Sequence, residues 1–332
     1  MRRAIFILAG IGGVVALLLG LAFYLLHAPA PPIPDLGGRA EPGTIRVGEL
    51  ERKYLLYSPA RKSPSPALVI VFHGSMGSSA SIRAETGYGF DRLAERDGFV
   101  VAYPQGFEGH WNDCRKAADF SARRLRIDDV GYFEALVARL QAELGIDPQR
   151  VFVAGLSNGG QFVFRLALER PERIAGGAAF GANLPTPDNN DCAVRGPPPP
   201  VMIVNGTSDP INPYDGGVVT LFGTGNRGTV LSAFESARQL AGAGSGPWPA
   251  AVRIEPKGAK DPTWVERSVW RVPGRSEVQL LSVHGGGHVV PQSLYRPRRL
   301  LGRSTSAIEG PAEAWSFFRR QPDRLMPGAP PQ

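Results

Sequence analysis

Short apolar runs rich in β-branched residues recur along the chain, and stretches with helical spacing separate them. Runs of this kind predict strands that are buried on both faces, as in a parallel sheet. The clearest runs lie at residues 67–72, 100–103, 151–154, 201–204 and 278–283. Helical patterns lie between and after them, at residues 90–96, 129–144, 161–169, 229–240 and 309–319. This alternation predicts a doubly wound α/β fold with a mostly parallel sheet.

Two stretches depart from the pattern. Residues 44–58 favour an antiparallel pair at one edge of the sheet. Residues 241–275 are the least regular part of the chain and predict a loop or a small insertion, with a flexible segment at AGAGSGPWP (241–249). We therefore expect the sheet to be built mainly from the five apolar runs.

The N-terminus has a different character. Residues 4–26 form an uncharged apolar run of 23 residues behind Arg2 and Arg3. A run of this length can cross a bilayer as a helix, and the two arginines favour a cytoplasmic N-terminus. We expect residues 1–27 to be a signal anchor. The alternatives are a cleaved signal peptide, whose only candidate cleavage site (28–30) is crowded by prolines, and a buried helix.

The remaining organisation follows from this N-terminus. Residues 28–43 are rich in Pro and Gly and predict an extended linker before a catalytic domain at 44–322 and a disordered tail at 323–332. We expect this domain to be exported and membrane-anchored, facing the periplasm or the cell exterior, or secreted if the N-terminal segment is cleaved. Outside the cytoplasm the two cysteines, Cys114 and Cys192, can pair, with two buried thiols as the alternative.

Composition excludes several classes of protein. A hydrophobic fraction of 43% is too high for a disordered chain, and two cysteines cannot form a disulfide scaffold or a four-thiolate metal site. The net charge of +7 suggests a polyanion partner, but residues 296–324 hold seven Arg against three acidic residues, and Arg2 and Arg3 add two more positive charges. Most of the excess therefore lies outside the segments that carry the candidate catalytic residues, and no nucleic-acid partner is expected. The oligomeric state stays open.

A G-x-S-x-G pentapeptide places a candidate nucleophile at Ser157. The motif GLSNG (155–159) follows one predicted strand and leads into a predicted helix. That setting is typical of the nucleophile elbow of α/β-hydrolases, where a sharp turn exposes the serine and a Cβ at either flanking glycine would clash. An ordinary Gly-rich turn is the alternative.

A serine nucleophile needs a base and an orienting acid, which follow it in this order: Ser, acid, His. After Ser157 the only histidines are His284 and His288, and we favour His288 because it lies past three glycines on a loop. Asp209, just beyond a strand, is the favoured acid, and Asp215 is its rival. The two histidines do not predict a metal site, because no third ligand is evident.

An oxyanion hole requires two backbone N–H groups. Asn158, directly after the nucleophile, is the first candidate. Ser75, in the loop HGSMG (73–77) after an early strand, is the second, and Met76 is its alternative. We interpret His73 as a residue that shapes this loop rather than as a base.

Taken together, these segments resemble the polyhydroxybutyrate depolymerase-like esterases, a group that includes feruloyl, acetylxylan and LpqC-like esterases. The resemblance spans about residues 50–320 and rests on VFHGSMGS, YPQG, WNDC, DDVGYFEALV, IDPQRVFVAGLSNGG, NGTSDPINPYDGG, VLSAFESA and GGGHVVP. It implies an α/β-hydrolase fold, the triad Ser157, Asp209 and His288, and hydrolysis of carboxylic esters without a cofactor. It also implies that Asp128, Asp129 and the region around Cys114 support the site.

Two departures from the family affect the expected substrate. Val290 stands where the family usually has a Trp that borders the substrate cleft, and no polymer-binding module follows residue 320. We therefore expect small or oligomeric esters of the hydroxyalkanoate, acetyl or feruloyl type. Candidate cleft residues are Met76, Trp111 and Val290, with Trp264 as a further aromatic, although tryptophans such as Trp111 and Trp264 more often pack in the interior.

Two rival functions remain at this stage. One is a serine peptidase of the prolyl oligopeptidase type, although no propeller repeat is visible in the sequence. The other is a catalytically silent α/β-hydrolase that serves as a binding protein. The presence of all three triad candidates favours the esterase over both.

Overall fold

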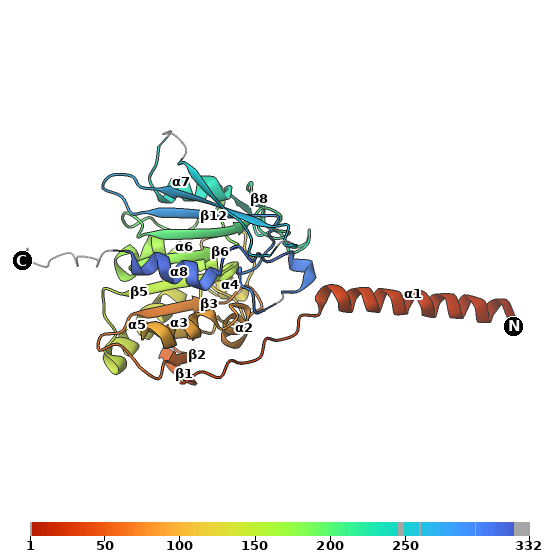
Figure 1. The fold of residues 1–332 in the computed structure, drawn as a ribbon, viewed down its shortest axis with the longest axis horizontal. Coiled ribbons are helices and arrows are strands. Elements are labelled where there is room, and N and C mark those ends of the chain that lie inside the picture. The colour runs from red at the N-terminus through yellow and green to blue at the C-terminus, as the bar shows by residue number, and fades with distance from the viewer. Residues whose placement is uncertain (1, 245–248, 259, 296, 322–332) are drawn as a thin grey trace, which may run out of the picture.

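A computed structural model gives the fold of the chain (Figure 1). It describes residues 2–244, 249–258, 260–295 and 297–321, with side chains from residue 13 onward. Within these residues, ten strands form one sheet in the order β1-β2-β4-β3-β5-β6-β7-β12-β11-β10. The central strands from β4 to β12 are parallel, and antiparallel pairs complete both edges. The prediction of a mostly parallel α/β sheet is confirmed.

The elements alternate along the chain as the sequence pattern predicts. The strands are β1 (Arg39–Val47), β2 (Leu50–Ser58), β3 (Leu68–Phe72), β4 (Val100–Pro104), β5 (Val151–Leu156), β6 (Gly176–Phe180), β7 (Val201–Gly206), β8 (Gly217–Val218), β9 (Thr229–Val230), β10 (Ala251–Ile254), β11 (Trp264–Trp270) and β12 (Val278–His284). The helices are α1 (Arg2–Leu26), α2 (Ser79–Glu85), α3 (Gly89–Asp97), α4 (Ser121–Arg124), α5 (Asp129–Leu144), α6 (Asn158–Glu169), α7 (Ala233–Leu240) and α8 (Gly310–Arg319), with short 3-10 turns at Pro171–Arg173, Pro187–Asn189 and Arg299–Leu301.

Helices cover both faces of the sheet, and each face has its own core. Successive strand residues point to opposite faces, so Leu68 and Ile70 pack with apolar residues of α5, α6 and α7, whereas Val69 and Val71 pack with those of α2, α3 and α8. This double burial explains why the parallel strands are continuous apolar runs.

The sequence pattern missed three strands of the main sheet for a common reason, which is that none is a continuous β-branched run. β6 has the sequence GGAAF and is nevertheless buried, because only small residues fit against α6 at this point. β10 and β11 lie within residues 241–275, which were predicted to be a loop or insertion, and that prediction is wrong. β11 is antiparallel and only partly buried, so its apolar residues are interrupted by Glu266 and Arg267.

Helix boundaries also differ from the prediction. The pattern at 229–240 combines a short strand, β9, with the helix α7, which begins at Ala233 behind a Ser232 cap. The helix α2 was not predicted, and a capping box between Ser78 and Ser81 starts it. The predicted edge pair at 44–58 is confirmed by β1 and β2.

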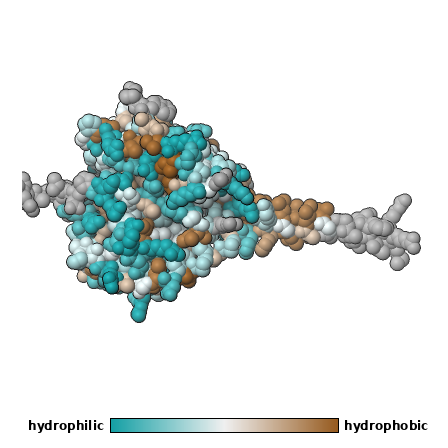
Figure 2. Space-filling view, in the orientation of Figure 1, coloured by the Kyte–Doolittle hydropathy of each residue, from teal (hydrophilic) through white to brown (hydrophobic). Residues whose placement is uncertain are grey.

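The N-terminal helix α1 extends away from the body of the molecule (Figure 1). Its described apolar side chains lie on the surface (Figure 2), with Leu17 at 72% and Phe23 at 64% exposure. Tyr24 contacts Arg299, whose guanidinium lies 4.2 Å from the ring centroid.

Among the residues whose structure is described, no helix is both long and apolar enough to cross a membrane. The predicted anchor extends onto residues 1–12, whose side chains lie outside the described part. The predicted tail at 323–332 and four residues of the predicted flexible segment, 245–248, also lie outside it.

Candidate active site

Ser157 occupies a sharp turn between β5 and α6. Its backbone has φ 56° and ψ −118°, a conformation that a residue with a Cβ rarely adopts. Two hydrogen bonds hold the turn: the N–H of Ser157 donates to the carbonyl of Phe180 at 2.8 Å, and the N–H of Gln161 donates to the carbonyl of Ser157 at 2.8 Å. The surrounding structure thus fixes a strained serine at the carboxyl end of the central strand, where its side chain remains partly exposed.

The flanking glycines are required by close packing of the backbone. A Cβ on Gly155 would overlap the backbone of Gly159, and a Cβ on Gly159 would overlap the carbonyls of Phe72 and His73. These contacts agree with the prediction that a Cβ at either glycine would clash.

His288 and Asp209 form a buried pair beyond the carboxyl ends of the parallel strands, where Ser157 also lies. The Nδ1 atom of His288 lies 2.7 Å from Oδ2 of Asp209, and their side chains are 6% and 1% exposed. The other carboxylate oxygen of Asp209 accepts the backbone N–H groups of Ile211 and Asn212, each at 2.8 Å. The carboxylate therefore has a fixed orientation, and it holds the imidazole with its Nε2 atom away from Asp209.

The His288 ring lies next to the turn that carries Ser157. A Cβ added to Gly181 would lie 3.0 Å from Nδ1 of His288 and 3.5 Å from a side-chain carbon of Leu156, so the ring packs over Gly181 beside the elbow. Gly181 directly follows Phe180, whose carbonyl binds the N–H of Ser157. Among the described residues, no side chain forms a hydrogen bond with Oγ of Ser157. The structure brings the three predicted residues to one place but does not show a Ser157–His288 hydrogen bond.

The loop after β3 lies directly beside the nucleophile. A Cβ on Gly74 would be 3.4 Å from Cβ of Ser157, and a turn closed by the N–H of Gly77 and the carbonyl of Gly74 at 3.1 Å presents Ser75 and Met76. At the start of α6, the N–H of Asn158 is one of the donors that a helix leaves without an internal partner. The two predicted oxyanion donors, Ser75 and Asn158, therefore flank Ser157.

His73 shapes this loop, as we interpreted it. Its Nε2 atom accepts the N–H of Gly106 at 2.9 Å, so Nδ1 carries the proton and donates to the carbonyl of Gly74 at 2.7 Å. The ring is fully buried, and this burial lowers the pKa of His73 to about 4. A buried, neutral imidazole with both nitrogens occupied is a structural support for the turn at 74–77.

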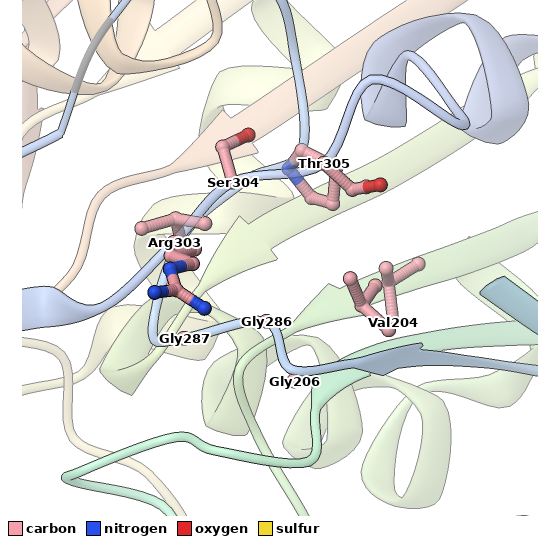
Figure 3. Close-up of a pocket in the computed structure, with 10 residues that line it drawn as sticks. Val204, Gly206, Gly286, Gly287, Arg303, Ser304 and Thr305 are labelled. Carbon is pink, nitrogen blue, oxygen red and sulfur yellow. The ribbon is translucent and has the colours of Figure 1, made fainter. Parts of the chain in front are cut away.

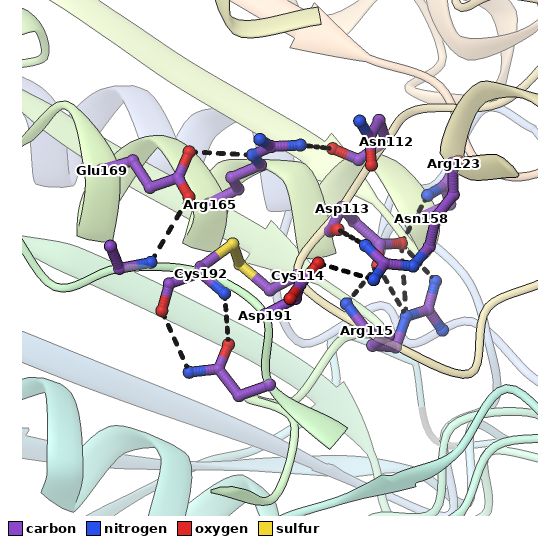
Figure 4. The surroundings of a disulfide bond; sticks show 12 residues. Asn112, Asp113, Cys114, Arg115, Arg123, Asn158, Arg165, Glu169, Asp191 and Cys192 are labelled. Carbon is purple, nitrogen blue, oxygen red and sulfur yellow. Dashed lines mark hydrogen bonds and ion pairs between the residues drawn. A yellow bond between two sulfur atoms is a disulfide. The ribbon is translucent and has the colours of Figure 1, made fainter. Parts of the chain in front are cut away.

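A buried network anchors Asn158 (Figure 4). Its side-chain oxygen accepts the N–H of Trp111 at 2.8 Å, and its side-chain nitrogen donates to Oδ2 of Asp113 at 2.7 Å. The same carboxylate binds the Arg115 guanidinium at 2.5 Å. Asp113 was not predicted as a site residue, and the only sequence signal was its place in the WNDC block.

The disulfide between Cys114 and Cys192 closes this network, and the predicted pairing is confirmed. It joins the loop after β4 to the loop after β6 across 78 residues of sequence (Figure 4). Asp129 supports the same loop from the other side, since it accepts the N–H of Asn112 at 2.7 Å and pairs with Arg52 at 2.6 Å. Asp128 instead caps α5 through the N–H of Gly131.

Two of the three predicted cleft residues are buried in the interior, which corrects the prediction. Trp111 has no exposed surface, because it packs between Phe72 and Phe162 and donates its indole N–H to the carbonyl of His73 at 3.0 Å. Val290 is 3% exposed. Met76 is 68% exposed and remains a candidate.

The rival candidates lie elsewhere. His284 stacks on Trp264 with ring centroids 3.6 Å apart, and its Nε2 lies 3.8 Å from a carboxylate oxygen of Glu266. Asp215 is exposed. In the part of the chain that the structure describes, no three His, Cys, Asp or Glu side chains are grouped so that they could hold a metal ion.

A small pocket lies behind the loop that carries His288 (Figure 3). The backbone of this loop is bound to the segment after it, through Gly287 to Arg303 at 2.8 Å and His288 to Leu301 at 2.7 Å. Ser157, Asp209 and His288 do not line the pocket. Its lining includes Val204, Gly206, Gly286, Gly287, Arg303, Ser304 and Thr305. The two backbone hydrogen bonds hold the loop that carries His288 against residues 301–303.

Comparison with known proteins agrees with this geometry. The sequence pattern of the dienelactone hydrolase family matches residues 53–219, which include the β3 loop, Ser157 and Asp209. The chain belongs to this family. Membership identifies it as an enzyme of the carboxylic-ester hydrolase class, as the sequence predicted.

Two individual relatives point to the same class of enzyme. NocK of Nocardia uniformis subsp. tsuyamanensis, which is named an esterase, is 30% identical over 269 residues, or 76% of this chain and 75% of that protein. A poly(3-hydroxybutyrate) depolymerase of Ralstonia pickettii is 30% identical over 185 residues, or 52% of this chain but only 37% of that protein. The resemblance to esterases of this group is thus confirmed.

One solved structure shows the same overall fold. The acetyl xylan esterase from Aspergillus awamori superposes with a TM-score of 0.52 over 84% of this chain and 99% of that chain, at 17% identity. The two chains therefore share one overall fold, of the α/β-hydrolase-like type.

Proposed function

We propose that the protein hydrolyses carboxylic esters through an acyl-enzyme formed on Ser157. The observation that carries this proposal is the buried His288–Asp209 hydrogen bond at 2.7 Å beside a serine held on a strained turn. Because Asp209 accepts the Nδ1 proton, Nε2 of His288 is the unprotonated nitrogen and acts as the base.

The reaction uses groups whose positions are described above. Ser157 attacks the ester carbonyl while His288 takes its proton, and the N–H groups of Asn158 and Ser75 stabilise the oxyanion. The alcohol leaves with the proton from His288. Water then attacks the acyl-enzyme with His288 again as base, which releases the carboxylic acid and restores Ser157.

The substrate class that we propose is small or oligomeric esters of the hydroxyalkanoate, acetyl or feruloyl type. The names of the relatives support this range, because they include a poly(3-hydroxybutyrate) depolymerase and, in the structural comparison, an acetyl xylan esterase. An acyl series from acetyl to octanoyl, with a feruloyl ester added, measures which of these the enzyme prefers.

Replacement of the nucleophile tests the mechanism. We expect Ser157→Ala to lose nearly all activity on p-nitrophenyl acetate and butyrate with an unchanged circular dichroism spectrum. Ser65→Ala is the matched control, because Ser65 is exposed on a loop between β2 and β3. Unchanged hydrolysis by Ser157→Ala refutes the proposal, because another residue would then be the nucleophile; no hydrolysis by the wild type would instead favour a binding protein.

We also propose that the enzyme works outside the cytoplasm, attached through its N-terminal segment. The support is the uncharged run at 4–26 behind Arg2 and Arg3, together with a disulfide that an oxidising compartment maintains. Fractionation of cells that express the full chain tests this: recovery in the cytosolic fraction contradicts it.

A further inference from the structure

One arginine near the candidate active site forms no ion pair within the part of the chain that the structure describes. Arg227 lies on the loop between β8 and β9 and is half-buried, yet its guanidinium forms no hydrogen bond or ion pair with any described residue. Its neighbours are paired: Arg115 binds Asp113 at 2.5 Å, and Arg123 binds Asp191 at 2.7 Å. Burial and the nearby Arg115 charge lower the pKa of Arg227, and the Asp113 carboxylate, which Arg115 already binds, offsets them only in part.

The guanidinium of Arg227 lies over an aromatic ring. Its central carbon is 5.5 Å from the centroid of Phe120, and the ring of His110 stacks on Phe120 with centroids 4.4 Å apart. Asn189 binds the backbone carbonyl of Arg227 at 3.3 Å and so holds this part of the loop in place. The result is a fixed cation beside a flat aromatic surface.

This cluster borders the oxyanion side of the site. Arg115, which also lies over Phe120 at 5.8 Å, binds the Asp113 carboxylate that holds Asn158, the residue after the nucleophile. The loop before His110 packs on the turn after β3, since a Cβ on Gly109 would be 3.2 Å from Cα of Met76. Arg227 is therefore linked to Asn158 through Phe120, Arg115 and Asp113, and to the turn after β3 through Phe120 and the loop at His110.

We propose that Arg227 binds a carboxylate carried by the substrate, so that the enzyme prefers esters with a free acid group a few carbons from the scissile bond. This inference rests on the proposed esterase function and specifies its substrate. A substrate carboxylate supplies the hydrogen-bonded anion that Arg227 lacks and can accept two hydrogen bonds from the guanidinium, while the aromatic rings pack against the chain that connects it to the ester. Hydroxyalkanoate oligomers with a free carboxyl end have this chemistry.

Paired substrates of equal chain length test the proposal on the full-length protein. p-Nitrophenyl hydrogen glutarate carries the carboxylate, and p-nitrophenyl pentanoate lacks it; the succinate and adipate half-esters vary its distance. We expect Arg227→Gln to lower kcat/KM on at least one half-ester by about tenfold or more through KM, as for loss of a charged hydrogen bond. Activity on pentanoate should stay within about twofold, and Arg227→Lys should retain part of the preference.

Controls separate the possible outcomes. Arg46→Gln makes the same charge change on an exposed residue of the distant edge strand β1, and it should alter neither substrate. Ser157→Ala measures the spontaneous breakdown of each half-ester. An equal loss on neutral and anionic esters, or no loss on either, overturns the role of Arg227 while leaving the esterase in place. Failure of the unmodified enzyme to hydrolyse any ester overturns the proposed function itself.

Discussion

The side chain of Asn158 donates to the carboxylate of Asp113 at 2.7 Å, and this bond connects the residue after the nucleophile to the disulfide loop. The position of the Asn158 backbone N–H, a proposed oxyanion donor, therefore depends on a loop about 45 residues earlier in the chain.

Replacement of Asp113 tests this dependence. We expect Asp113→Asn to lower kcat on p-nitrophenyl butyrate by about tenfold or more with little change in KM, since a displaced donor weakens binding of the transition state only. Asp119→Asn is the control, because Asp119 lies in the same loop but is 78% exposed in its pair with Arg124. Wild-type kcat in a folded Asp113→Asn variant contradicts the connection.

The orienting acid can be distinguished from its rival by two matched substitutions. Asp209→Asn should lower kcat by about three to four orders of magnitude, because the amide favours the wrong tautomer of His288. Asp215→Asn, an exposed neighbour six residues further along the chain, should leave kcat unchanged. The reverse result would assign the acid to Asp215.

Close backbone packing at the elbow predicts a stability effect. Gly159→Ala inserts a methyl group against the carbonyl of Phe72, and we expect a loss of about 3 kcal/mol in the free energy of unfolding. Gly258→Ala is the control, since no atom lies within 4 Å of a Cβ there. Urea denaturation measures both, and equal stability of the two variants would show that the elbow can relax.

Reduction of the disulfide should destabilise the protein. A bond that closes 78 residues is worth about 4–5 kcal/mol on the chain-entropy estimate. We expect dithiothreitol to lower the melting temperature of the wild type but not of a folded Cys114→Ser/Cys192→Ser double variant. Thiol titration of the unfolded, unreduced protein should find no free cysteine, and two titratable thiols would refute the bond.

The buried His73 predicts a loss of stability in acid. Its pKa is about 4 in the folded protein and 6.5 when unperturbed, so between these values the unfolded chain binds more protons. The stability present above pH 6.5 should fall as the pH approaches 4, by about 3 kcal/mol from this group. His73→Gln should flatten the pH dependence of urea denaturation, whereas His27→Gln, directly after α1, should not. If the stability of the wild type, His73→Gln and His27→Gln changed equally with pH, the assignment to His73 would be contradicted.

The sequence predicted the parts of this protein that depend on local pattern. The parallel strands are apolar because both faces are covered, and the G-x-S-x-G turn places its glycines where the backbone of Phe72 and Gly159 leaves no space. Strand β6, whose Phe180 carbonyl holds the Ser157 N–H, has no such pattern, because small residues carry no periodic signal.

Long-range contacts account for what was missed at the site. Trp111 could line a cleft or fill the core, and only its contacts with Phe72 and Phe162 decide for the core. Likewise, the bond from Asp113 to Asn158 joins two segments 45 positions apart, and the unpaired state of Arg227 is visible only when every nearby carboxylate is placed.

The positive φ of Ser157 also limits which amino acid can serve as the nucleophile. Threonine offers the same hydroxyl chemistry, but its branched Cβ is poorly tolerated in this backbone region. An unbranched side chain such as that of cysteine meets no such barrier. The backbone conformation of the turn thus limits which nucleophile can replace serine. Among the hydroxyl and thiol side chains, it favours serine and cysteine over threonine.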